Sequence, residues 1–225
     1  MTEDWNGEEL KAVVQSYVEM QHSERAGRLL VKKHYYKNLA ERFGRIEKLY
    51  EYRMQNVSYV LSLLGRSWLT GLKPSRNLDA GIGARIEKLL EEIEGRRRAP
   101  TGAFEIEARE QARQKDLHKP SGSSKPRARR VTITHFHRDA SVKAWVLQQA
   151  GGVCECCEHQ ASFNATDGLP YLELHYVQQL EEGGPDTVTN AVALCPGCHA
   201  EIHYGANAQA LIAWLYDNVS RLKRD

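Results

Sequence analysis

The sequence predicts a mainly helical protein that ends in a small α+β domain. Three observations support this fold class. Residues 1–95 carry apolar side chains at helical spacing, residues 96–138 are rich in proline, glycine and basic charge, and residues 139–225 contain all five cysteines. We therefore expect an N-terminal helical bundle over 1–95, a basic linker over 96–138 and a C-terminal domain over 139–225 that is stabilised by zinc.

The N-terminal region reads as a series of amphipathic helices. Asn6 is placed to begin the first helix, because a glutamate follows it three residues later in the pattern of a capping box. A second apolar series runs over 46–64, and Gly65 is placed to end that helix. Asp79 is placed to begin a further helix with its apolar residues facing inward. Together these segments predict a small helical bundle.

Basic charge is concentrated in the middle of the chain. Residues 96–145 contain 13 Lys+Arg against 5 Asp+Glu, whereas residues 146–225 contain 3 against 10. Clustered cations are typical of a surface that follows a phosphate backbone, and the plainer alternative is a solvated linker that includes a helix near 103–117. The residues predicted to contact DNA are Arg96, Arg97, Arg98, Arg127, Arg129 and Arg130.

Composition also excludes some classes of protein. The chain has no apolar run of roughly 18 residues, so no membrane span is predicted. Its acidic, polar start does not resemble a signal peptide. Closely paired cysteines in such a chain favour metal binding over disulfides, and we expect a reducing cytoplasm as the setting.

Four of the cysteines form two Cys-x-x-Cys pairs, Cys154 with Cys157 and Cys195 with Cys198. Each pair presents two sulfurs in one turn, which suits tetrahedral zinc. The alternative is a set of buried, inert thiols. Because four thiolates leave no open coordination position, this zinc is expected to stabilise the fold rather than catalyse a reaction. Cys156 is a spare thiol in this interpretation.

Three histidines accompany the cysteine pairs. His175 lies in a segment that alternates like a strand, and His199 and His203 are spaced by four residues, which places them on one face of a helix. The predicted order is strand, strand, helix over residues 171–177, 191–194 and 198–204.

This arrangement suits a second, catalytic cation. We assign a divalent metal to His175 and His203, with His199 as a possible third ligand, and a positioning role to Asn190. Imidazole ligands make Co²⁺ and Ni²⁺ plausible alongside harder ions. Each histidine taken alone is more often a surface or core residue, so the prediction depends on the ordered set.

Segment 142–223 resembles the HNH (ββα-metal) domain of McrA-like modified-cytosine restriction endonucleases. The resemblance implies that the chain cleaves double-stranded foreign DNA carrying modified cytosine, with Mg²⁺ or Mn²⁺ in the site. Residues 5–78 are similar to a helical module of some HNH restriction proteins, which is expected to read DNA, dimerise, or both. The stretches that carry the HNH resemblance are 142–149, 168–175, 183–187, 192–196 and 199–204.

One position departs from the family pattern. The family has two adjacent histidines at the end of the first strand, of which the first binds metal and the second is the general base. Here the pair is His175 and Tyr176. A tyrosine with a pKa near 10 is only about one part in a thousand ionised at pH 7, and losing a matched base costs roughly 10²- to 10⁴-fold in rate. Either Tyr176 inactivates the site, or a pKa-lowered Tyr176 or a nearby histidine such as His199 replaces the base.

Two functions of different class follow. The first is a restriction-type DNA endonuclease, expected to be a homodimer because one nuclease domain cuts one strand. The second is a non-catalytic, zinc-stabilised DNA-binding protein, favoured by Tyr176 and by the acidic C-terminal third. A nuclease that acts on RNA or on one strand only is a third interpretation.

Overall fold

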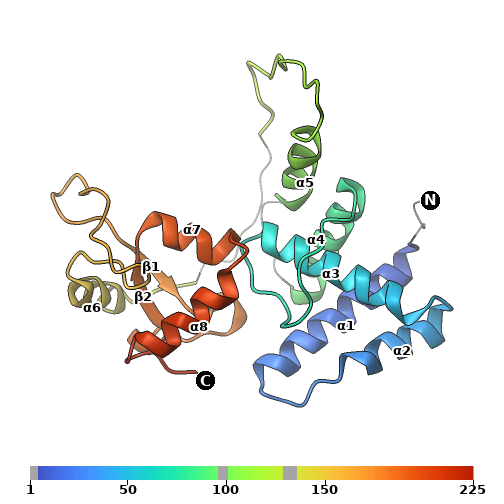
Figure 1. Ribbon diagram of the computed structural model, residues 1–225, viewed down its shortest axis with the longest axis horizontal. Coiled ribbons are helices and arrows are strands. Elements are labelled where there is room, and N and C mark those ends of the chain that lie inside the picture. Colours follow the sequence, from blue (N-terminus) through green and yellow to red (C-terminus); the bar gives the residue numbers. More distant parts are fainter. Residues whose placement is uncertain (1–4, 96–100, 129–135, 225) are drawn as a thin grey trace. The chain divides into compact units, whose positions relative to one another are not determined.

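The computed structural model describes residues 5–95, 101–128 and 136–224. The chain divides into two compact units, Met1–Thr134 and His135–Asp225. The predicted fold class is confirmed, since the described residues are mainly helical and contain a single small sheet of two strands (Figure 1).

The N-terminal unit is built on four packed helices. Capping follows the prediction, since the Asn6 side chain accepts a hydrogen bond from the backbone N–H of Glu9 at 2.8 Å and Asp79 accepts one from that of Ile82 at 2.8 Å. Gly65 adopts the left-handed conformation (φ 66°) just after the third helix, where L-residues with a Cβ are strained. The helices are α1 (Gly7–Arg25), α2 (Lys32–Phe43), α3 (Glu47–Leu63) and α4 (Ala80–Glu94).

Two buried tyrosines tie this core together. The Tyr17 hydroxyl lies 2.7 Å from Ser58 Oγ on α3 and accepts a hydrogen bond from the backbone N–H of Leu69 at 3.0 Å. Tyr50 donates to the buried carboxylate of Glu9 at 3.0 Å. Because buried polar groups destabilise a core unless they are paired, these bonds hold the loop after α3 and the start of α1 in place.

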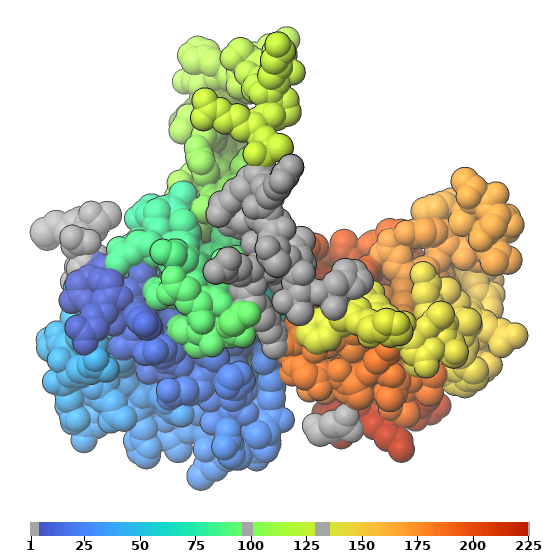
Figure 2. Space-filling model, turned by 180° about the vertical axis from the view of Figure 1, so that it is seen from behind, coloured from blue at the N-terminus to red at the C-terminus, as the bar shows by residue number. Residues whose placement is uncertain are grey.

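The region predicted as a linker is partly structured. Helix α5 (Gly102–Gln111) packs on α4, and Ile106 is buried against Gly83, where an added Cβ would stand 2.2 Å from the Ile106 side chain. The buried Glu87 carboxylate accepts the backbone N–H of Gly102 at 3.1 Å. Residues 101–111 therefore belong to the N-terminal unit instead of the linker, and the segment up to residue 128 projects from that unit (Figure 2).

The C-terminal unit places two strands between helices. The strands are antiparallel, with His175 opposite Val192 and Tyr176 opposite Ala191. The buried residues of the second strand form the centre of the core. The elements are α6 (Ala140–Ala150), β1 (Glu173–Tyr176), two short 3-10 helices (Leu180–Glu182 and Val188–Asn190), β2 (Ala191–Leu194), α7 (Pro196–Tyr204) and α8 (Ala208–Asn218).

A bidentate ion pair links the C-terminal segment to the rest of this unit. The Arg221 guanidinium donates to both carboxylate oxygens of Glu155 at 2.6 Å, and Glu155 also accepts the backbone N–H of Ala193 at 2.7 Å. Bidentate pairs of this kind combine charge with fixed geometry. The C-terminal segment is thereby joined to the first cysteine turn and to β2.

Helices long and apolar enough to cross a membrane do not occur among the described residues.

Candidate active site

The two cysteine pairs converge at the start of α7. Cys154 and Cys157 lie in the turn after α6, Cys195 is the N-cap of α7, and Cys198 lies in its first turn. Their four sulfurs all lie within 4.8 Å of one another, and all are free thiols rather than disulfides. The pattern of two separate Cys-x-x-Cys turns thus produces one cluster.

The surroundings of the sulfurs fit a structural zinc site. Backbone N–H groups donate to sulfur, from Cys195 to Cys154 Sγ at 3.2 Å and from Cys198 to Cys195 Sγ at 3.5 Å. Burial, followed by the neighbouring thiols, raises the pKa of Cys198. Four clustered thiolates therefore need a cation to be stable, and a four-sulfur set with supporting N–H donors suits Zn²⁺. Cys156 is buried beside the cluster and is not one of the four.

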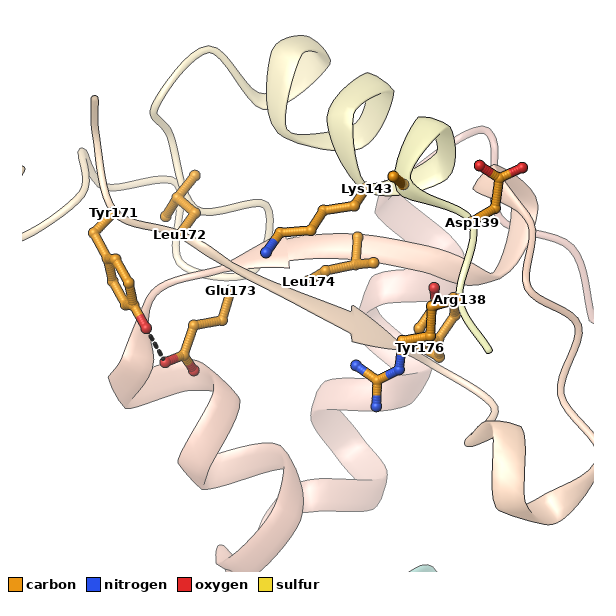
Figure 3. A pocket seen from close by; sticks show the side chains of 9 residues that line it. Arg138, Asp139, Lys143, Tyr171, Leu172, Glu173, Leu174 and Tyr176 are labelled. Atoms are coloured by element: carbon orange, nitrogen blue, oxygen red, sulfur yellow. Dashed lines mark hydrogen bonds between the residues drawn. The ribbon is translucent and has the colours of Figure 1, made fainter. Parts of the chain in front are cut away.

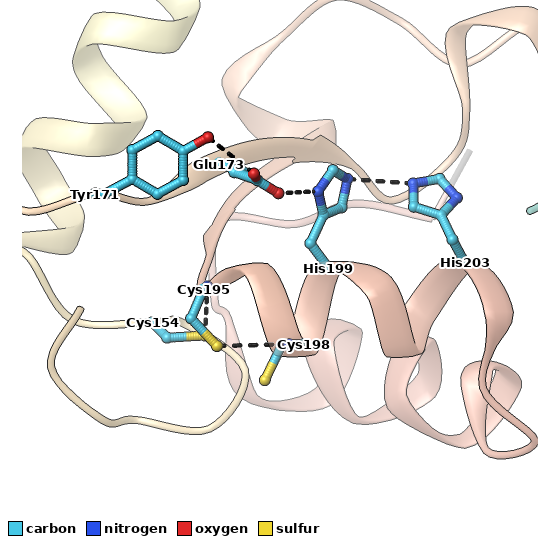
Figure 4. A network of polar contacts seen from close by, with 7 residues as sticks. All are labelled: Cys154, Tyr171, Glu173, Cys195, Cys198, His199 and His203. Carbon is cyan, nitrogen blue, oxygen red and sulfur yellow. Dashed lines mark hydrogen bonds and ion pairs between the residues drawn. The ribbon is translucent and has the colours of Figure 1, made fainter. Parts of the chain in front are cut away.

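The three histidines form a second cluster, of which Figure 4 shows His199 and His203. β1 supplies His175, and successive turns of α7 supply His199 and His203. One ring nitrogen from each lies within 4.8 Å of the others, and the two Nε2 atoms on α7 are 3.2 Å apart. The sequence spacing predicted that His199 and His203 share one face of α7, and in the structure His175 of β1 lies beside that face.

His175 has the properties of a metal ligand. Its ring is 3% exposed, and its Nε2 atom has no hydrogen-bond partner. Burial, followed by the charges of His203 and His199, lowers the pKa of His175 to about 3, which keeps the ring neutral. A neutral imidazole offers a lone pair, and a buried polar atom without a partner is costly. A divalent cation among the three rings would satisfy that atom, so the residues fit such an ion.

Glu173 is a functional residue that the sequence analysis did not single out. Its Oε2 atom lies 2.5 Å from His199 Nδ1, and its Oε1 atom accepts a hydrogen bond from the Tyr171 hydroxyl at 2.9 Å. A carboxylate bound to one imidazole nitrogen fixes the ring and turns the other nitrogen toward a metal. The sequence feature that could have identified Glu173 is the strand alternation, which places Tyr171, Glu173 and His175 on one face.

Tyr176 points to the other side of β1. It donates a hydrogen bond to Asp186 Oδ1 at 2.6 Å, while the backbone N–H of Asp139 donates to Asp186 Oδ2 at 2.6 Å. Burial, then the hydrogen bond to Asp186 and its charge, raises the pKa of Tyr176 to about 12. A general base would need a pKa shifted in the opposite direction. In this arrangement the phenol is a hydrogen-bond donor.

Asn190 holds the loop that follows β1. Its Oδ1 atom accepts the backbone N–H of Gln178, and its Nδ2 atom donates to the carbonyls of Gln178 and Pro185, all at 2.9 Å. Gly184 allows this close packing, because an added Cβ would stand 2.0 Å from the Gln178 carbonyl oxygen. All hydrogen-bonding groups of this buried amide face the loop backbone.

Five of the six arginines predicted to contact DNA lie outside the described residues. These are Arg96, Arg97, Arg98, Arg129 and Arg130. Arg127 is exposed.

Comparison with known proteins identifies the C-terminal domain type. Residues 154–205, which contain both clusters, match the HNH endonuclease family. The chain is 50% identical over 110 residues to the type IV methyl-directed restriction enzyme EcoKMcrA of Escherichia coli (strain K12), a match that covers 49% of this chain and 40% of that protein. It is 38% identical to the solved type IV phosphorothioation-dependent restriction endonuclease ScoMcrA over 37% of this chain and 17% of that chain, with a TM-score of 0.35. The part of the C-terminal unit that holds both clusters therefore matches the HNH endonuclease family, and the chain is similar there to a methyl-directed restriction enzyme.

Proposed function

We propose that this chain is a divalent-metal-dependent DNA endonuclease of the restriction type. The observation that supports this most is the histidine cluster inside the HNH match, where three ring nitrogens converge and His175 Nε2 has no other partner. The four-cysteine cluster stabilises the fold with zinc. Mg²⁺ or Mn²⁺ is the expected working cation, and Co²⁺ or Ni²⁺ also suits three imidazoles.

Each residue of the proposed active site has a role that follows from its position. His175, His199 and His203 would hold the cation, Glu173 fixes the His199 ring, and Asn190 holds the loop that carries Asp186. The bound cation would polarise the phosphodiester and stabilise the leaving oxygen. Asp186 accepts the hydrogen bond of Tyr176, and we infer that it would orient a histidine placed at position 176 as a base.

The target is proposed to be foreign double-stranded DNA with modified cytosine, by analogy with the methyl-directed restriction enzyme to which the chain is similar. Because the match covers 49% of this chain, the remaining residues of this chain need a role of their own. We assign DNA binding or dimerisation to the N-terminal unit, backbone contact to the basic arginines, and a homodimer as the cutting form. A cytoplasmic, reducing setting keeps the thiols available for zinc.

A second candidate is a non-catalytic DNA-binding protein. The observation that favours it is the bond from Tyr176 to Asp186, together with the raised pKa of the phenol. Such a protein would keep the zinc-stabilised fold and bind DNA without cutting it.

One assay separates the two candidates. Plasmids with and without methylated cytosine are incubated with the chain and with a Tyr176→His variant, in turn with Mg²⁺, Mn²⁺, Co²⁺ and Ni²⁺. The nuclease proposal expects metal-dependent nicking that is faster for the variant and for modified plasmid. DNA binding without nicking by either protein would support the second candidate instead.

A further inference from the structure

The C-terminal unit has a hollow of about 390 Å³ between α6 and β1. Figure 3 shows the side chains around it, with Lys143 extending along β1 toward Glu173 and Arg138 beside Tyr176. Glu173 lines this hollow and also contacts His199. The hollow and the histidine cluster are therefore adjacent, with one carboxylate in common.

The C-terminal unit has few lysines and arginines, so the positions of these few side chains decide where it can contact a polyanion. Residues 135–225 contain 5 Lys+Arg against 11 Asp+Glu. Arg221 is bound to Glu155, and Arg224 pairs with Asp217 at 3.3 Å. An acidic unit must still approach a polyanion if it acts on DNA, and long-range repulsion opposes that approach. The three remaining cations are Arg138, Lys143 and Lys223.

Two of these three cations line the hollow. The Arg138 guanidinium lies 5.8 Å from the centre of the Tyr176 ring, and Lys143 is exposed on the first turns of α6. The carboxylates there are engaged elsewhere, since Asp139 caps the backbone N–H of Ser141 at 2.7 Å and Glu173 binds Tyr171 and His199. Among the described residues neither carboxylate forms an ion pair with Arg138 or Lys143, so both cationic side chains can contact a ligand.

We propose that this hollow binds a backbone phosphate of the DNA strand that is cut, next to the phosphodiester at the histidines. This rests on the proposed nuclease function and adds the surface that positions the substrate. Lys143 and Arg138 supply the charge, and the side chains of Tyr176 and Leu174 also line the hollow. Both cations are positioning residues, because neither is placed at the reacting atoms.

Lysine acetylation of the full chain tests the location directly. A water-soluble acetylating reagent is applied with and without a modified-cytosine duplex, and peptide mass spectrometry follows Lys143 and, as the matched control, the exposed Lys223. We expect the duplex to slow acetylation of Lys143 and to leave Lys223 unchanged. Equal rates at Lys143 with and without bound duplex would overturn the proposal.

The salt dependence of binding gives a second readout. The slope of log affinity against log salt should fall by about one for Lys143→Gln and by about two for Lys143→Gln with Arg138→Gln, and should not change for Lys223→Gln. These positions are exposed, so the variants are expected to fold, which circular dichroism checks. An unchanged slope in the double variant would contradict the proposal.

Failure of the nuclease function is distinguishable from failure of this inference. Protection of Lys143 without any nicking by the Tyr176→His chain would keep the phosphate site and reject the nuclease. Nicking without protection of Lys143 would support the nuclease function and reject the phosphate site. A chain that binds no duplex would reject both.

Discussion

The cysteine cluster and the histidine cluster share one helix yet differ in how completely their atoms are satisfied. The first turn of α7 supplies Cys195 and Cys198, and the following turns supply His199 and His203. The sulfurs number four and receive backbone N–H groups, whereas the imidazoles number three and leave a buried nitrogen of His175 without a partner. The cysteine cluster leaves no coordination position open, whereas the histidine cluster does. This difference favours a structural role for the cysteines, which fix α7, and a functional role for the histidines that α7 carries.

The largest expected effect is the loss of the cysteine site. Cys154→Ser should prevent folding of the C-terminal unit, because structural zinc contributes on the order of 10 kcal/mol to folding. Zinc content and the thermal unfolding of the chain measure this.

Cys156→Ser is the matched control for that variant. Cys156 is buried beside the cluster without belonging to it, so the substitution should retain zinc and change the free energy of unfolding only slightly. If the two variants lost zinc equally, the assignment of the four ligands would be wrong.

The next effect concerns the residue beside the open site. Tyr176→His should raise Mn²⁺-dependent nicking by roughly 10²- to 10⁴-fold, because Asp186 is placed to orient an imidazole as general base. Tyr176→Phe, which removes only the hydroxyl, should show no gain. A histidine variant no faster than the phenylalanine variant would reject position 176 as the base.

Removal of a ligand from the open site should be selective. His175→Ala is expected to weaken Mn²⁺ binding by more than the roughly 100-fold that outer-sphere changes reach, while zinc stays bound. Calorimetric titration of Mn²⁺ and zinc analysis report the two sites separately. Loss of zinc in this variant would show that the clusters are not independent.

The smallest effect is expected at Glu173. Glu173→Gln keeps the shape of the side chain and removes the charge that holds His199, so Mn²⁺ affinity should fall by roughly 10- to 100-fold. Tyr171→Phe, which removes only the hydroxyl bond to Glu173, should lower the Mn²⁺ affinity less. Equal affinities in Glu173→Gln and the unchanged chain would argue that the carboxylate does not orient the ring.

The comparison also shows what local spacing encodes. The sequence predicted that the four cysteines and the three histidines gather into two groups, because Cys-x-x-Cys turns and the i, i+4 histidines have fixed local geometry. The bonds of Glu173 to His199 and of Tyr176 to Asp186 were not predicted, since they join side chains brought together only by the tertiary fold.

The fold shows the same limit in the N-terminal unit. Helices α1, α3 and α4 were located from their caps and apolar periodicity. Helix α2 was not located, because it buries only Tyr36 and Leu39 among mostly polar residues. The attachment of α5 to α4 depends on the contact between Gly83 and Ile106, which no spacing rule reveals.

The most direct test follows zinc content and nicking in one sample of the Tyr176→His chain. After brief chelation and dialysis, we predict that zinc remains at about one per chain, that nicking is absent, and that added Mn²⁺ restores it. Nicking that persists without added cation, or that returns only when zinc is resupplied, would contradict the division into a structural sulfur site and a working imidazole site.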